Sequence, residues 1–553
     1  MQPTASVLRL SALLTFAFYA TVGCTDRAVD SQASSAAPDG APAALAERAP
    51  PTPTPNPSPA DGGGGGGKME DSAGLLEDAW YALYLDSVKA GHRHIAVWKT
   101  ARDGKTLTEI AGREVMRIVR DGTEATIEFQ CISRSDEEGV FLEAEYRLPD
   151  GLDHGWKRAV VDGESLHIRP KSDHKVATTI PWPEDARGPY AVGVSLRKRP
   201  LRPGETRSLR FFDPALGQVT EASLTAKDWE LTQLSGGADR SGSEYRLLPI
   251  DVLVRLPNDS ELASRVWTDE HGIVWKESQR VGVEITAFRT SKENALAVDA
   301  NPPTDLFRNF LVPVTPPIDR PRKLAEIVYR VTVAEGDPAK LFVDDVRQDM
   351  ESARLRQVQL VVRAGAAPGQ SSPGEPTTDV DRPTAADTAA SSAVDSDDAK
   401  IRELSTTVVP KATDAAVVAR ALEQLVFQIV QEKSYGSVFA SAGEVLASRE
   451  GDCTEHSVLF VALCRARGIP ARAAMGLVYS EAHQAFAYHM WTEVWDGGQW
   501  LGLDATRARG QIGPTHLKMA NSSLAGPAAL IDMVTVMQAA RGLEIEVVST
   551  RGH

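Results

Sequence analysis

Three residues near the C-terminus could together perform nucleophilic catalysis. Cys453 offers a thiol, His489 an imidazole and Asp504 a carboxylate. A thiol becomes a strong nucleophile when a base removes its proton, and a carboxylate that holds the imidazole in one tautomer completes the arrangement. These residue types predict acyl transfer through a covalent thioester, provided that the fold brings the three side chains together.

The residues around Cys453 predict that it lies in the first turn of a helix. Asp452 and Glu455 form an acidic variant of the capping box, which places the helix N-terminus at Asp452. Apolar residues then recur at helical spacing as far as Ala466, and Gly468 ends the helix. The partial positive charge at the helix start favours the thiolate, and unpaired amides there are suited to stabilise an oxyanion.

The residues after His489 predict a β-hairpin that carries both the base and the carboxylate. An Asp-Gly pair at 496–497, between two strand-like runs, is typical of a two-residue turn. With that turn, Trp495 pairs with Gly498. Counting back along both strands then pairs His489 with Asp504. Cross-strand partners lie on one face with Cβ atoms about 5 Å apart, so this register predicts a hydrogen-bonded pair.

Other ionisable residues near these three have less suitable positions. Glu493 shares a strand face with His489 but lies four residues along the strand, too far to orient the imidazole. Further histidines that could be imagined as metal ligands with Cys453 are His456, His483 and His516. Their spacing matches no closed zinc pattern. We therefore expect neither a metal nor any other cofactor.

This part of the chain resembles the core of the bacterial transglutaminase-like superfamily. The resemblance extends over residues 415–515 and rests on the stretches GDCTE (451–455), ALCRARGIPAR (462–472) and HMWTEV (489–494), followed by Trp500 and Asp504. It implies a papain-like α+β fold with a catalytic triad. In that triad Cys453 is the nucleophile, His489 acts first as base and then as acid, and Asp504 orients the imidazole.

Two aromatic residues near the triad have expected roles, that of Tyr435 implied by the resemblance. Tyr435 falls where relatives often carry an oxyanion-hole or cleft residue. Trp491, two residues after His489, is expected to line the cleft or to pack the sheet.

The chain has four cysteines, too few for a disulfide scaffold. Cys453 and Cys464 cannot pair within one helix, because eleven residues at a rise of about 1.5 Å separate them by roughly 16 Å. A disulfide needs Cα atoms within about 7 Å. Cys464 and Cys131, the latter in a strand-like segment, are therefore expected to pack in the core.

The fourth cysteine, Cys24, ends a segment that resembles a bacterial lipoprotein signal. The apolar run from Leu10 to Val22 has the length of a signal-peptide core and is too short to span a bilayer. The residues before Cys24 resemble the lipobox, with Thr21 where the family prefers Leu. The resemblance implies that residues 1–23 are removed and that an acyl chain on Cys24 anchors the protein in the cell envelope. The alternative is ordinary signal cleavage, which would leave a soluble secreted protein.

Two low-complexity segments divide the rest of the chain. Residues 24–72 predict a flexible tether and residues 364–400 a disordered linker, because neither holds enough apolar material to fold. Residues 73–363 alternate polar and apolar side chains between turn signals, which favours a mainly antiparallel β region of one or two subdomains. The transglutaminase-like domain is expected at 401–530, followed by a C-terminal segment at 531–553.

Composition excludes one class of function and leaves two open. The 553 residues carry a net charge of -15, which argues against binding nucleic acid. The first hypothesis is an envelope cysteine hydrolase that acts on amide bonds of a peptide or protein, with water favoured over an amine as the acyl acceptor. The second is a binding or assembly module on the same scaffold. The presence of all three triad residues favours the enzyme, and the oligomeric state stays open.

Overall fold

The computed structural model describes residues 74–552. The gaps in this range are 103, 121–122, 149–154, 172–177, 235–243, 257–260, 282, 299–310, 334–336, 366–380, 432–439, 509, 526–527 and 541. The expected signal peptide and tether, with Cys24, and the expected cleft residue Tyr435 lie outside the described residues. None of the helices in the described ranges combines the length and the apolar character needed to cross a bilayer.

The N-terminal part of the described chain forms one large sheet. Its strands are β1 (Leu75–Leu85), β2 (Val88–Arg102), β3 (Lys105–Arg120), β4 (Thr123–Ser135), β5 (Phe141–Arg147), β6 (Lys157–Asp162), β7 (Ser165–Pro170), β8 (Thr178–Pro181), β9 (Ala186–Arg187), β10 (Thr206–Asp213), β11 (Gln218–Ala226), β12 (Glu230–Gln233), β13 (Glu244–Arg255), β14 (Glu261–Thr268), β15 (Val274–Val281) and β16 (Val283–Thr290). The strands run in order from β8 to β1 and then from β16 back to β9, except that β12 lies off this path and pairs with β13. Among the described strands of this sheet, only β9 and β10 pair in parallel. The predicted antiparallel β region is therefore present.

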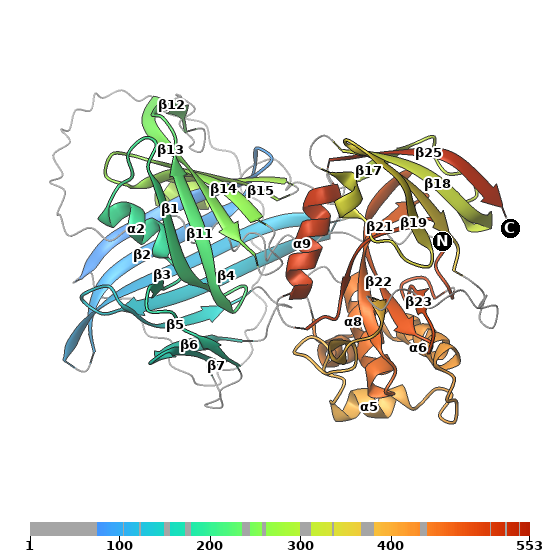
Figure 1. Ribbon diagram of the computed structural model, residues 1–553. Helices are drawn as coiled ribbons and strands as arrows, with labels where there is room; N and C mark the ends of the chain where they lie inside the picture. Colours follow the sequence, from blue (N-terminus) through green and yellow to red (C-terminus); the bar gives the residue numbers. More distant parts are fainter. Residues whose placement is uncertain are drawn as a thin grey trace, which may run out of the picture.

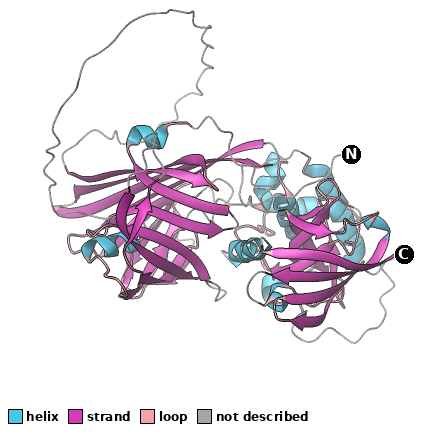
Figure 2. Cartoon of the chain, turned by 90° about the horizontal axis from the view of Figure 1, so that it is seen from above, coloured by secondary structure: helices cyan, strands magenta, loops and turns pink. Residues whose placement is uncertain are grey.

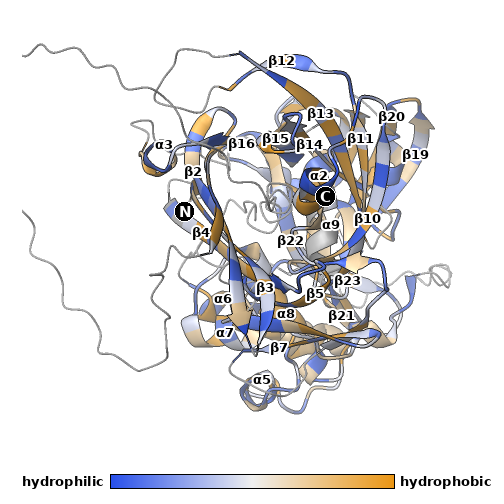
Figure 3. Ribbon diagram, turned by 90° about the vertical axis from the view of Figure 1, so that its left-hand side faces the viewer, coloured by the Kyte–Doolittle hydropathy of each residue, from blue (hydrophilic) through white to orange (hydrophobic). Residues whose placement is uncertain are grey.

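Alternation along these strands gives the sheet one apolar face. In β11, for example, every second residue after the first two is buried. Figure 3 shows hydrophobic and hydrophilic segments interleaved along the strands of this sheet. In Figure 1 the long strands curve around a common core, with the short helix α2 (Ala191–Lys198) packed beside them. A second short helix, α3 (Lys292–Leu296), follows β16.

A second sheet carries the residues of chemical interest. It comprises β17 (Val312–Thr315), β18 (Leu324–Val333), β19 (Gln348–Arg354), β20 (Gln357–Arg363), β21 (Ala471–Ser480), β22 (Ala485–Trp495), β23 (Trp500–Leu503), β24 (His516–Ser522) and β25 (Leu543–Gly552). The order is β19-β20-β18-β25-β17-β22-β21-β24, and β23 pairs with β22. Figure 2 shows this sheet and its helices as a unit beside the first sheet.

The boundary between the N-terminal and C-terminal units lies earlier in the chain than the sequence patterns predicted. Residues 312–363, expected in the N-terminal β region, pair with β25 and β22 of the C-terminal unit. The described residues 381–400 of the expected linker also pack on that unit. The carbonyl of Asp381 accepts a hydrogen bond from Nε1 of Trp500 at 2.7 Å, and its carboxylate pairs with Arg472 at 2.7 Å. The amino-acid composition of residues 364–400 suggested a linker, because composition carries no information about such contacts.

The described helices that accompany the second sheet are α5 (Ala399–Ser405), α6 (Ala415–Ile429), α7 (Ala442–Ser448), α8 (Cys453–Ala466) and α9 (Ala528–Ala540). Helix α8 packs against α5, α6, α7, β21 and β22 (Figure 1). It is therefore buried on all sides from Cys453 to Arg465, whereas the sequence showed one apolar stripe. The helix ends as predicted, because Gly468 has φ 73° and the amide of Ile469 turns back to the carbonyl of Cys464 at 3.0 Å.

Candidate active site

Cys453 is the first residue of α8 and is almost fully buried, with 3 % of its surface exposed. Asp452 caps the helix: its carboxylate accepts from the amide of Thr454 at 2.8 Å. The carboxylate of Glu455 returns to the amide of Asp452 at 3.0 Å. Gly451 precedes the cap because a Cβ there would lie 2.2 Å from Cβ of Glu455. The predicted capping box is confirmed.

The backbone amides that were expected to stabilise an oxyanion are instead hydrogen-bonded within this helix cap. The amide of Thr454 donates to the carboxylate of Asp452, as does that of Glu455 within the capping box. The amide of His456 donates to the carbonyl of Asp452 at 3.1 Å. The expectation of several unpaired amides at this helix start is therefore wrong.

His489 and Asp504 form a buried hydrogen-bonded pair. Nε2 of His489, in β22, lies 2.9 Å from Oδ2 of Asp504, while Oδ1 accepts from the amide and hydroxyl of Thr506 at 3.0 and 2.5 Å. Burial by itself would raise the pKa of Asp504, but the charge and hydrogen bond of His489 hold that pKa well below its usual value. Because the carboxylate is charged and only accepts, Nε2 carries the proton. Nδ1 is then the ring nitrogen suited to accept a thiol proton.

The hairpin that carries this pair has a different register from the predicted one. Trp495 pairs with Trp500, so the turn spans 496–499. Asp496 closes this longer turn, because its carboxylate accepts from two backbone amides within it at 2.8 Å. The register shifts by two residues, and a shift of two keeps each side chain on its face of the sheet. The predicted register is wrong, yet the carboxylate just past β23 still meets His489.

The first turn of α8 lies close to the pair. Helix α8 packs against β22, the strand of His489. Burial lowers the pKa of His456, one turn after Cys453, and the charges of Asp504 and His489 are near enough to influence it. This contact puts the turn that carries Cys453 beside the pair, as acyl transfer requires. The catalytic roles of the three residues remain predictions.

A second histidine, His516, contacts the same carboxylate. It lies in β24, and its Nε2 is 3.4 Å from Oδ2 of Asp504. Burial lowers the pKa of His516 to about 3, so the ring is neutral at pH 7. Its Nδ1 has no hydrogen-bond partner among the described residues. The sequence suggested His516 only as a ligand together with Cys453, because no local spacing links β24 to Asp504.

A second buried acid lies behind Asp504. Glu423, on α6, is buried; this burial and the charge of Asp504 raise the pKa of Glu423 to about 8, so its carboxyl is mostly protonated at pH 7. It receives hydrogen bonds from the backbone of Gly510 and Asp504 and thereby braces the chain that leaves β23. One sequence signal existed for this residue: a glutamate next to Leu422, on the apolar face of a predicted helix. The helical pattern alone did not show whether that glutamate only packs in the core or also contacts the site.

Two residues with expected alternative roles are structural. Glu493 pairs with Arg472 at 2.8 Å and with the fully buried Lys518 at 2.6 Å, so it does not orient His489. Trp491 is buried in a small apolar cluster, with its ring centroid 5.4 Å from that of His516. It packs the sheet, which is one of the two roles expected for it.

The other described cysteines are inert by their surroundings. Cys131, in β4, and Cys464, in α8, are both fully buried. Burial raises the pKa of each thiol, which disfavours the reactive thiolate. Both pack in the core, as expected.

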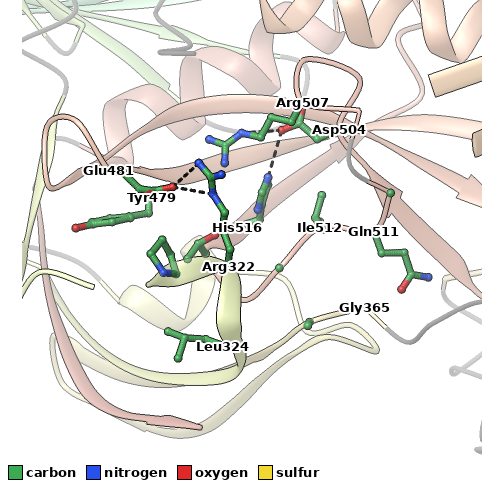
Figure 4. A pocket seen from close by; sticks show the side chains of 15 residues that line it. Arg322, Leu324, Gly365, Tyr479, Glu481, Asp504, Arg507, Gln511, Ile512 and His516 are labelled. Atoms are coloured by element: carbon green, nitrogen blue, oxygen red, sulfur yellow. Dashed lines mark hydrogen bonds and ion pairs between the residues drawn. The ribbon is translucent and has the colours of Figure 1, made fainter. Parts of the chain in front are cut away.

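A pocket of about 320 Å³ adjoins the pair on the side of Asp504 (Figure 4). Its wall includes Asp504, His516 and Arg507 from the core and Arg322 from the chain before β18. Nε of Arg507 lies 3.4 Å from Oδ2 of Asp504. Arg322 pairs with Glu481 at 2.9 Å at the exposed rim. The pocket thus connects the buried carboxylate with the surface through a polar opening.

Comparison with known proteins agrees with this geometry at the level of the family. Residues 402–505 match the transglutaminase-like superfamily. No curated protein matches the chain.

Similar solved structures are distant. A candidate cysteine protease from Cytophaga hutchinsonii has 18 % identity, covers 41 % of this chain and 86 % of its own, and has a TM-score of 0.26. A β-barrel-like protein from Brucella abortus of a domain family of unknown function has 11 % identity, covers 39 % and 95 %, and has a TM-score of 0.30. The periplasmic domain of TgpA from Pseudomonas aeruginosa, bound to ethylmercury, has 17 % identity, covers 33 % and 91 %, and has a TM-score of 0.14.

Proposed function

Because residues 402–505 form a transglutaminase-like domain, we propose that this protein is a cysteine hydrolase that cleaves amide bonds through a thioester acyl-enzyme. One observation carries the proposal. The buried pair of His489 and Asp504, joined at 2.9 Å, lies beside the capped helix turn that begins with Cys453. A positive helix end and a carboxylate-oriented imidazole are what a thiol needs to act as a nucleophile.

In the first half of the proposed reaction, Nδ1 of His489 accepts the thiol proton of Cys453. The thiolate sulfur attacks the amide carbonyl carbon, a C–S bond forms, and the carbonyl π electrons move to oxygen. When the carbonyl re-forms, the C–N bond breaks and His489 gives its proton to the leaving amine. Asp504 stays charged throughout and stabilises the imidazolium.

In the second half, His489 removes a proton from water, and the resulting hydroxide attacks the thioester. The C–S bond breaks, the acid product leaves, and the proton returns to Cys453. An amine in place of water would give a cross-linked product. We propose water because it is in large excess over any amine.

The proposed substrate is an amide bond of a peptide or protein in the cell envelope. In this proposal Cys24 carries the lipid, residues 24–72 hold the folded part away from the membrane, and the membrane and the amide substrate are the partners. The net charge of -15 supports a protein without a nucleic-acid partner.

A second candidate is a binding module that uses the same scaffold without catalysis. One observation favours it: Cys453 and His489 are both buried, so a substrate carbonyl would reach the sulfur only after a side chain or a loop moves. A thiol probe of small size distinguishes the two functions, because it tests access to Cys453 and activation of its sulfur together.

The test is labelling of the full chain with a small thiol-directed alkylating probe between pH 5 and 9, with the labelled peptide identified by mass spectrometry. For an enzyme, Cys453 labels rapidly well below the ordinary thiol pKa of about 8.5, and His489→Ala slows the labelling. Cys453→Ala is the negative control. Cys464→Ala, in the same helix, is the matched control and retains the fast labelling. If Cys453 labels no faster than a cysteine in an unfolded peptide, the binding module replaces the enzyme as the proposed function.

A further inference from the structure

The side chains around Asp504 have the composition of a metal site. Nε2 of His489 and Nε2 of His516 lie 2.9 and 3.4 Å from the same oxygen, Oδ2 of Asp504. Ligand atoms from all three residues lie within 4.8 Å of one another. Two imidazoles and one carboxylate form a donor set that suits zinc and neighbouring divalent transition metals.

We propose that His489, Asp504 and His516 form a regulatory zinc site that switches off the histidine of the proposed hydrolase. The regulatory part of this inference rests on the proposed function, whereas the metal site itself does not. Zinc ligands at about 2.0–2.2 Å in a tetrahedral site lie roughly 3.3 Å from one another. The two distances to Oδ2 of Asp504, 2.9 and 3.4 Å, are close to this value. The ligand atoms lie within 4.8 Å of one another, so the two imidazoles approach each other by up to about 1.5 Å to receive the ion.

The ring of His516 retains one nitrogen whose hydrogen bonding is not satisfied by the described residues. The side chain of His516 is 4 % exposed, and its Nδ1 has no hydrogen-bond partner among the described residues. A buried polar atom without a partner costs free energy, so a hydrogen bond to Asp504 does not by itself account for the ring. When zinc occupies Nε2, the ring proton moves to Nδ1, which becomes a donor. Oε1 of Gln511, an acceptor without a partner among the described residues, lines the same pocket, and a water there would join the two.

The pocket supplies a route for the ion and room for a fourth ligand. Its wall contains Asp504 and His516, and its rim carries the exposed pair of Arg322 and Glu481 (Figure 4). A volume of about 320 Å³ accommodates several waters. Zinc sites with three protein ligands commonly take water as the fourth. The ion therefore reaches the cluster without passing through the core.

Charge around the cluster limits how tightly the ion binds. Nε of Arg507 lies 3.4 Å from Oδ2 of Asp504, and the guanidinium repels a cation that approaches this oxygen. Its side chain is one quarter exposed and has space to turn into the pocket. The fixed charges nearest to the cluster are thus one carboxylate and one guanidinium, so zinc and Arg507 compete for Asp504.

Zinc at this site blocks the first proton transfer. The ion uses the lone pair of Nε2 of His489, so the single proton of the neutral ring stands on Nδ1. A protonated Nδ1 has no lone pair for the thiol proton of Cys453, and the thiol remains a thiol. No electron is transferred, and removal of the ion restores the proton to Nε2.

Binding is measured first in the Cys453→Ala chain, which lacks the thiol as a competing ligand. The full chain is freed of metal with a chelator, and zinc is titrated in competition with a chromophoric chelator of known affinity. Cobalt serves as a spectroscopic probe. The expected result is one ion per chain and cobalt absorption of tetrahedral intensity without a sulfur-to-metal charge-transfer band.

Ligand variants in the same Cys453→Ala background locate the ion. His516→Ala and the more conservative His516→Gln each weaken zinc binding at least tenfold, with folding checked by circular dichroism. Arg507→Gln tightens binding several-fold because it removes the competing cation. The matched control His483→Ala, which alters a histidine hydrogen-bonded to Ser480, leaves binding unchanged. Absence of stoichiometric binding, or binding that survives both His516 variants in folded protein, overturns the site.

The regulatory step is then measured in the chain that retains Cys453. Zinc at saturating concentration slows probe labelling of Cys453 at least tenfold, and a chelator restores it. Fast labelling together with no stoichiometric zinc binding refutes the metal site and leaves the proposed function intact. Zinc binding with slow labelling at every pH refutes the hydrolase while the metal site stands.

Discussion

In the N-terminal sheet, Arg93 on β2 is held between two carboxylates, Glu114 at 2.7 Å and Glu277 at 2.9 Å, and all three side chains are buried. In the C-terminal sheet, one buried carboxylate, Asp504, is shared by two imidazoles. Each cluster joins side chains from different segments of its sheet, and in each the charged groups are buried. Burial alone therefore does not separate a structural cluster from a chemical one.

The difference lies in what surrounds the groups that can exchange a proton. The guanidinium of Arg93 is always charged, and its two carboxylates raise its pKa further against the opposing effect of burial. Arg93 itself therefore cannot act as a base, and both carboxylates beside it are engaged in its ion pairs. The imidazole of His489 is paired with Asp504, and its strand packs against the helix that starts with Cys453. The cluster to which it belongs is reached by a pocket. The predictions below test this contrast.

The largest effect is expected for Asp504→Asn. The amide carries no charge to stabilise the imidazolium, so acyl transfer and low-pH labelling of Cys453 fall by about 10³–10⁴-fold. Labelling kinetics at pH 6 with the small thiol probe measure this. Asp496→Asn, in the turn between β22 and β23, is the matched control and labels as the unmodified chain does. Unchanged labelling in Asp504→Asn would show that the carboxylate is as structural as those around Arg93.

The next effect is on stability and concerns the other region. Arg93→Met leaves Glu114 and Glu277 buried without their cation, which costs about 3–5 kcal/mol of folding free energy. Urea unfolding, with hydrogen exchange to assign the loss to the N-terminal sheet, measures it. Cys453 labelling in folded protein stays unchanged. The triple variant Arg93→Met, Glu114→Leu and Glu277→Met recovers most of the stability, because no buried charge is left unpaired. Failure to recover would mean that the ion pairs contribute more than the neutralisation of the two buried carboxylates.

Acidification should change the contributions of His516 and Glu277 to stability in opposite directions. The folded pKa of His516, about 3, is below the usual 6.5, so the folded state binds fewer protons and its stability falls as pH drops. Between pH 6.5 and 5 the contribution of His516 falls by at most about 2 kcal/mol, at about 1.4 kcal/mol per pH unit. Glu423, whose pKa is raised to about 8, contributes a change of opposite sign over the same interval. Burial raises the pKa of Glu277 to about 7 from 4.5, so the N-terminal cluster instead loses stability as pH rises through this interval.

Hydrogen exchange at pH 5 and 6.5, read separately for peptides of the two sheets, measures these opposite trends. In His516→Gln the acid-induced loss in the C-terminal sheet shrinks, whereas the trend in the N-terminal sheet persists. An acid response of the C-terminal sheet that is the same in His516→Gln and in the unmodified chain would show that the neutral His516 does not contribute to it.

The smallest effect is expected at the helix caps. Asp452→Ala removes the cap of α8 and costs about 1 kcal/mol, and it also slows Cys453 labelling because the helix start frays. Ser291→Ala removes the hydroxyl that accepts from the amide of Asn294 at the start of α3, and it costs a similar amount without any effect on labelling. Thermal unfolding and the rate of Cys453 labelling, measured on both variants, test these two expectations. Equal labelling in the two variants would contradict a special role for the α8 cap.

The sequence by itself determined the local features of the site. The capping box of Asp452 and Glu455, the end of α8 at Gly468 and the hairpin after His489 all follow from residues within a few positions of one another. Local hydrogen bonds and backbone preferences decide such features, so they can be predicted from spacing. The antiparallel N-terminal region was also predictable, because alternation along each strand reports which face is buried.

The tertiary structure alone decided what surrounds Asp504. His516 arrives on β24 from the far side of β21, Glu423 from α6, and Arg322 from a segment that precedes the expected linker. The hairpin register also depended on how Asp496 closes its turn, which an Asp-Gly pair does not specify. No local pattern records such contacts, because they join segments far apart in the chain. Their formation depends on how the two faces of the second sheet are covered.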